Sequence, residues 1–173
     1  REALEHLTQA LDLLRRIGAR AAAAEALVGL AEARRVLGDY DAARKACDER
    51  LGVASAIGDV GLRARTLDLL GRLELARMRL DDAERCFQEA LDLRRAAGER
   101  AGEAASLLHL AEVAATRGEH EQALEAQGQA REIAEEIGDV GIGTRARVEM
   151  AGVQMRLANF EDPRRGRTAG FSL

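Results

Sequence analysis

Residues 60–97 read VGLRARTLDLLGRLELARMRLDDAERCFQEALDLRRAA, and this stretch decides the fold. Its first half carries leucines at helical spacing, with a small residue between them: Leu67, Leu70, Gly71 and Leu73. Its second half, Asp81 to Ala97, gathers small and apolar residues on one helical face: Ala83, Phe87, Ala90, Leu91 and Ala97. Neither half alternates as a strand does. The stretch therefore predicts two helices joined by a short turn.

This pattern recurs along the chain every 40 residues. Ile17-Gly18-Ala19 returns as Ile57-Gly58-Asp59, Ala97-Gly98-Glu99 and Ile137-Gly138-Asp139. Other positions obey the same shift, for example Ala3, Ala43, Ala83 and Ala123, or Leu27, Leu67 and Leu107. One amphipathic helix pair cannot bury its apolar face alone, whereas stacked pairs cover one another. The repeat predicts an all-α fold, an α-solenoid of stacked antiparallel helix pairs.

Glycine and aspartate mark the predicted helix ends. The recurring Gly suits the position after a helix end, where the backbone is left-handed. Asp59 and Asp139 follow directly and are expected to cap the next helix. The frame predicts a helix over 2–17, helix pairs over 20–57, 60–97 and 100–137, and a final helix over 142–157. These form a repeat domain over 1–160, followed by an irregular or disordered tail at 161–173.

The composition fits closely packed helices. Of the 173 residues, 47% are hydrophobic but only 2% aromatic, which excludes a disordered chain and argues against an all-β fold. Leu, Ala, Val and Ile must build the core, and small residues let helices approach closely. The net charge is −4 with a pI near 5.5, so bulk charge favours neither nucleic acid nor anionic membranes as partners.

The helix pairs resemble the tetratricopeptide repeat, in the longer variant of about 40 residues found in kinesin light chain and bacterial regulators. The resemblance rests on Leu67, Leu70 and Gly71 in a first helix and on Ala83, Phe87 and Ala90 in a second. It implies a right-handed superhelix whose first helices line a concave groove. HEAT-type repeats overlap this length and are the structural alternative. Residues 40 positions apart occupy the same place in successive repeats and form a repeat column. The column that holds the large residue of the second helix contains Leu7, Cys47, Phe87 and Gln127.

The sequence shows no constellation for catalysis, and we expect no enzyme, cofactor or metal site. Cys47 and Cys86 do not form a CxxC pair and are expected to be near-core residues in a reducing compartment. His109 and Glu112 share a helix face, but no third ligand accompanies them. The sequence contains neither a phosphate-binding glycine motif nor a serine in a nucleophile-elbow context.

What remains is the surface that the resemblance assigns to the groove. We expect the following residues to contact a partner: Glu32, Arg35, Arg65, Asp68, Leu69, Arg72, His109, Glu112, Arg145 and Glu149. Their charges are mixed in sign, so an exclusively acidic or basic ligand is not favoured. The alternative is that these charges pair across neighbouring helices and only solvate the groove.

These observations lead to two functional hypotheses. The first is a non-catalytic interaction or scaffold domain, a fragment of a larger protein, that binds a peptide or helix in the groove. The second is a regulatory or self-association module of a bacterial signalling or transcription regulator, with contacts through uncapped solenoid ends. Both predict a cytoplasmic protein with protein or peptide partners, and neither predicts binding to nucleic acid or a membrane.

Overall fold

The computed structural model describes residues 2–161, and this range contains eight α-helices and no strand. The helices are α1 (Glu2–Arg16), α2 (Arg20–Val36), α3 (Tyr40–Ile57), α4 (Val60–Ala76), α5 (Leu80–Ala97), α6 (Arg100–Arg117), α7 (His120–Ile137) and α8 (Val140–Glu161). The final helix is longer at both ends than the predicted 142–157, and α1 ends one residue before the predicted 17. Of the tail predicted at 161–173, Glu161 ends α8 and the rest lies outside the described residues.

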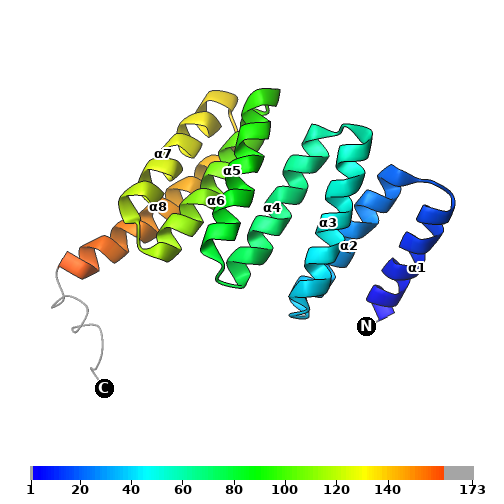
Figure 1. Ribbon diagram of the computed structural model, residues 1–173. Coiled ribbons are helices and arrows are strands. Elements are labelled where there is room, and N and C mark those ends of the chain that lie inside the picture. The colour runs from blue at the N-terminus through cyan, green and yellow to red at the C-terminus, as the bar shows by residue number, and fades with distance from the viewer. Residues whose placement is uncertain (1, 162–173) are drawn as a thin grey trace, which may run out of the picture. The chain divides into compact units, whose positions relative to one another are not determined.

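The helices fall into two compact units. The N-terminal unit ends at Gly98 and contains α1 to α5, and the C-terminal unit begins at Glu99 and contains α6 to α8. Within each unit, every helix packs against the next one in the chain, and Figure 1 shows these neighbours running antiparallel. No helix within residues 2–161 is sufficiently long and apolar to span a bilayer.

The predicted roles of glycine and aspartate at the helix ends are confirmed. Gly58 and Gly138 adopt the left-handed backbone, with φ of 69° and 70°. Asp59 Oδ1 accepts a hydrogen bond from the Leu62 N–H at 2.7 Å, and Asp139 Oδ1 accepts one from the Ile142 N–H at 2.9 Å. These bonds satisfy amide donors that the first turn of a helix leaves unpaired. The short connections between helices therefore follow from local sequence.

The core of the N-terminal unit is mainly aliphatic, and one buried ring lies close to a glycine. Leu27 and Ala31 of α2 lie in one apolar cluster with Leu70 and Leu73 of α4. On α5, Phe87 is fully buried against α4. A Cβ on Gly71 would lie only 2.4 Å from its ring, so this close approach requires glycine. The chain has few aromatic residues, and at this contact a glycine allows the helices to lie close together.

A buried arginine connects α2, α3 and α4. Arg50 on α3 is only 3% exposed. Its Nε donates to the Ala24 carbonyl at 3.0 Å and its guanidinium donates to Thr66 Oγ1 at 2.7 Å. Thr66 in turn donates to the Leu62 carbonyl at 2.7 Å. Burial lowers the pKa of Arg50, and the hydrogen bonds offset the cost of burying its charge.

One buried cluster of the C-terminal unit consists of small side chains. Ala114 of α6, Ala123 of α7 and Val153 of α8 form one buried cluster. Gln127, which occupies the column of Phe87, is also buried on α7. A polar amide therefore stands where the preceding repeat places a ring.

Candidate functional site

The predicted groove residues of the N-terminal unit lie on α2 and α4, and three of them are joined by ion pairs. Glu32 on α2 accepts a hydrogen bond from Arg35 Nε at 2.8 Å and from an Arg72 guanidinium nitrogen on α4 at 2.8 Å. One carboxylate thus holds two guanidinium groups on neighbouring first helices. The pair of Glu32 and Arg72 therefore agrees with the alternative raised from the sequence, in which charged groove residues pair across neighbouring helices.

Arg65 and Asp68, both on α4, differ in their surroundings. Arg65 is exposed and has no ion pair within residues 2–161, so its guanidinium is available to a partner. The Asp68 carboxylate is largely buried and lies 2.5 Å from a guanidinium nitrogen of Arg94 on α5. Asp68 therefore connects two helices, whereas Arg65 faces solvent.

The expectation of an exposed Leu69 is wrong. Leu69 is only 3% exposed and belongs to the core cluster that contains Leu70 and Leu73. The reason is that α4 packs against both α3 and α5, so it buries a wider arc than a helix with one covered face. Leu69 contributes to packing, and it is not part of the exposed surface.

The predicted groove residues of the C-terminal unit lie on α6 and α8. Arg145 Nε donates to Glu149 Oε1 at 2.7 Å, one turn apart on α8. His109 on α6 is half-buried. Glu112 is exposed, and its carboxylate has no ion pair among the described residues. Glu112 and Glu149 both line a pocket, whereas His109 and Arg145 do not.

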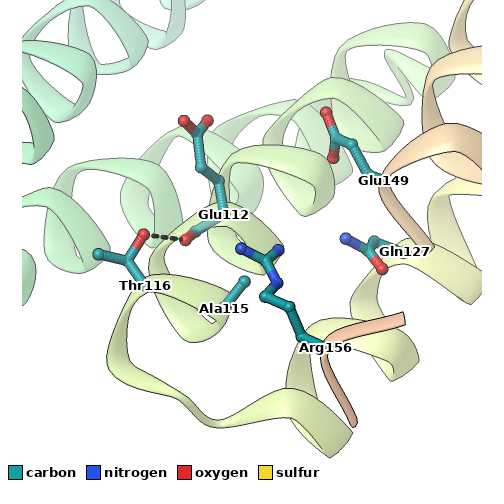
Figure 2. A pocket seen from close by; sticks show the side chains of 6 residues that line it. All are labelled: Glu112, Ala115, Thr116, Gln127, Glu149 and Arg156. Atoms are coloured by element: carbon teal, nitrogen blue, oxygen red, sulfur yellow. Dashed lines mark hydrogen bonds between the residues drawn. The ribbon is translucent and has the colours of Figure 1, made fainter. Parts of the chain in front are cut away.

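This pocket has a volume of about 320 Å³ and lies within the C-terminal unit. It is lined by Glu112, Ala115 and Thr116 of α6, Gln127 of α7, and Glu149 and Arg156 of α8. Figure 2 shows these side chains arranged around a common space, with the amide nitrogen of Gln127 on the side of Arg156. The groove prediction did not include Gln127, although its polar character in an otherwise apolar repeat column is a signal for it.

The thiols lie close to or within the core. Cys47 is buried and Cys86 is half-buried, and both are free. Burial raises the pKa of Cys47 to about 12 and that of Cys86 to about 11, so both remain protonated at neutral pH. Over residues 2–161, the structure contains no group of three or more His, Cys, Asp or Glu side chains that could hold a metal.

Solved structures share the fold, among them the following two. The crystal structure of BtubC (BKLC) from P. vanneervenii aligns with 90% of this chain and 65% of its own, at 19% identity and a TM-score of 0.81. A Signal Transduction ATPase with Numerous Domains with a tetratricopeptide repeat sensor, from Pyrococcus horikoshii, aligns with 80% of this chain and 22% of its own, at 19% identity and a TM-score of 0.70. This chain thus spans less than two thirds of either protein. No curated protein matches the sequence significantly.

The tetratricopeptide repeat model matches the sequence twice, over residues 22–96 and 62–136. Each match covers helix pairs whose boundaries the structure describes. The helix pairs are therefore of the tetratricopeptide type, and the HEAT-type alternative is set aside. Because the overlapping matches span well over half of the sequence, the chain belongs to the tetratricopeptide repeat family.

Proposed function

We propose that this chain is a non-catalytic interaction domain that binds a peptide or a helix of a partner protein along its first helices. Tetratricopeptide repeats generally serve as protein-interaction scaffolds, and repeat stacks present extended binding surfaces. The observation that carries the proposal is the polar face of α2 and α4. On this face the Glu32 carboxylate positions two guanidinium groups, and Arg65 remains without an ion pair.

This arrangement favours recognition of acidic or carbonyl groups. The ion pairs from Glu32 hold Arg35 and Arg72 in place, so a partner would lose less side-chain entropy in ordering them. Guanidinium groups donate in a planar fork that matches carboxylates and backbone carbonyls. Because carboxylates share this face, we propose a partner segment of mixed charge rather than a purely acidic one.

The test uses Arg65 because changing it breaks no ion pair. Phage-displayed dodecapeptides are selected on the wild-type chain, and affinities of selected peptides are then measured for Arg65→Glu. A matched control is Lys45→Glu, an exposed cation on α3 with the same charge change. We expect Arg65→Glu to weaken binding about tenfold or more and Lys45→Glu to leave it unchanged. Equal affinities for the two variants would show that the peptides bind elsewhere.

A second proposal is a regulatory or self-association module in the cytoplasm of a bacterium. It is supported by the likeness to a protein whose tetratricopeptide repeats are a sensor, and by two exposed apolar residues on α8, Val148 and Met155. Exposed apolar surface favours protein contacts. Sedimentation of the wild type and of Val148→Ser/Met155→Ser tests it. The proposal expects a concentration-dependent dimer in the wild type alone, and a monomer in both counts against it.

Neither proposal includes nucleic acid or a membrane as a partner. The support is electrostatic, because a net charge of −4 disfavours accumulation on phosphate backbones or anionic lipids. Filter binding of a labelled 30-base-pair duplex at low salt is expected to show no retention above that of an acidic control protein.

A further inference from the structure

The pocket of the C-terminal unit contains a buried amide whose oxygen has no hydrogen-bond partner. Gln127 is 2% exposed, and its Oε1 is buried without a donor. The other repeats place Leu7, Cys47 or Phe87 in this column, so packing alone does not call for an amide. A buried polar group without a partner destabilises the fold, and such groups are rare in native proteins. Gln127 therefore points to a ligand rather than to packing.

Two opposite charges that line the same pocket also have no ion-pair partner among the described residues. Glu112 from α6 presents a carboxylate, and Arg156 from α8 presents a guanidinium. The third charged group, Glu149, already accepts a hydrogen bond from Arg145 at 2.7 Å. Figure 2 shows Glu112, Arg156 and Gln127 around one space, contributed by three helices. A ligand that satisfies all three must carry a cation and a hydrogen-bonding anion.

The size of the pocket limits the ligand further. A volume of about 320 Å³ lies at the lower end of small-molecule sites, which span about 300–1,000 Å³. The remaining lining side chains from α6 are short, Ala115 and Thr116. The Thr116 hydroxyl donates to the Glu112 carbonyl at 2.7 Å, so it can only accept from a ligand. A compact molecule with a small side chain fits these limits.

We propose that this pocket binds a small free amino acid as a zwitterion. Its α-ammonium group donates to the Glu112 carboxylate, and its α-carboxylate accepts from the Arg156 guanidinium and from the Gln127 amide nitrogen. Reorganisation of the Gln127 amide on binding allows its oxygen to accept from the ammonium group. This small-molecule site lies in the C-terminal unit, so it goes beyond the proposed partner surface on α2 and α4 and can fail without affecting it.

The experiment compares three ligands that differ in one charge each. L-alanine, N-acetyl-L-alanine and L-alaninamide are titrated into the ¹⁵N-labelled full chain, and the side-chain amide signal of Gln127 is followed by NMR. We expect a saturable shift with L-alanine and affinities weaker by about tenfold or more for both blocked ligands, because each has lost one charge-assisted pair. The absence of a saturable shift, or equal affinity for all three ligands, overturns the proposal.

Two variants assign the charges. Glu112→Gln is expected to weaken L-alanine about tenfold but to leave N-acetyl-L-alanine unchanged, because the latter has no ammonium group. Arg156→Gln is expected to weaken L-alanine similarly and to leave L-alaninamide unchanged. Glu132→Gln is the matched control, since Glu132 is exposed on α7 and does not line the pocket. Unchanged L-alanine binding in both pocket variants overturns the proposal and indicates that the site holds only water.

Discussion

The contact between Gly71 and Phe87 predicts that one added methyl group destabilises the N-terminal unit. In Gly71→Ala, the new Cβ would lie 2.4 Å from one ring carbon of Phe87 and 2.7 Å from two others. Carbon atoms attract best at about 3.5–4.0 Å, so the ring or the helix must retreat by more than about 1 Å. Phe87 is fully buried, which leaves the ring little room to turn.

Two terms of opposite sign set the magnitude. Overpacking a core typically costs about 1–3 kcal/mol. Alanine is a better helix former than glycine by about 0.8–1.0 kcal/mol, which offsets part of that cost. We therefore expect Gly71→Ala to lower the free energy of unfolding by up to about 2 kcal/mol. In urea, with a slope of about 2 kcal/mol per molar, the midpoint falls by up to roughly 1 M.

The chain provides its own reporter and control. Tyr40 is the only tyrosine and there is no tryptophan, so its fluorescence follows the N-terminal unit alone. Gly52→Ala is the matched control, because Gly52 lies inside α3 with open space around it. This control is expected to gain up to about 1 kcal/mol, so the difference between the two variants isolates the packing term.

A rescue experiment makes the test stricter. In the preceding repeat, Cys47 takes the place of Phe87 and Ala31 takes the place of Gly71. A smaller residue opposite thus leaves room for alanine. Gly71→Ala should therefore do less harm, or none, in a Phe87→Leu background. If Gly71→Ala is as stable as Gly52→Ala in the wild-type background, the close contact does not control stability and the reasoning is refuted.

Three further predictions concern the same unit, and the first two use the fluorescence of its single tyrosine. Thr66→Val leaves the buried Arg50 guanidinium without its acceptor at 2.7 Å and should cost about 1.5–3 kcal/mol; an unchanged urea midpoint would contradict the network. Met78 is exposed at φ 58°, so Met78→Gly should relieve left-handed strain and raise stability by about 1 kcal/mol; a loss would contradict this. The folded pKa values of Cys47 and Cys86, about 12 and about 11, exceed their unfolded value near 9.0, so stability should fall between pH 9 and 11, and less so in a Cys47→Ala/Cys86→Ala variant. Urea unfolding followed by circular dichroism measures this, and identical pH profiles would oppose it.

The sequence predicted most helix boundaries because these depend on local chemistry. Gly58 requires the left-handed backbone, and Asp59 caps the next helix, wherever the helices pack. The predicted burial of α4 was less accurate, because a periodic pattern shows which residues share a face but not how many neighbours cover the helix. Leu69 was placed on the surface for this reason, and the second neighbour of α4 buries it.

The candidate surface was predicted in part. The pair of Glu32 and Arg72 joins positions 40 residues apart, so opposite charges in one repeat column of adjacent repeats could have indicated it. The partner of Asp68 could not be predicted in this way, because Arg94 belongs to a different column on α5. Side-chain geometry decides whether a charged residue forms an ion pair within the protein or remains available to a partner. The repeat period does not contain this geometry.

Buried polar residues that depart from their repeat column separate into two kinds. Arg50 stands in a column of alanines, and the Ala24 carbonyl and Thr66 each accept a hydrogen bond from it, so contacts within the fold account for it. Gln127 stands in a column of apolar residues, and its amide oxygen is left without a donor. Folding alone favours leucine over an unsatisfied amide at such a position. The presence of the amide therefore agrees with the proposed interaction with a ligand, and the pocket beside it is the place where that interaction can occur.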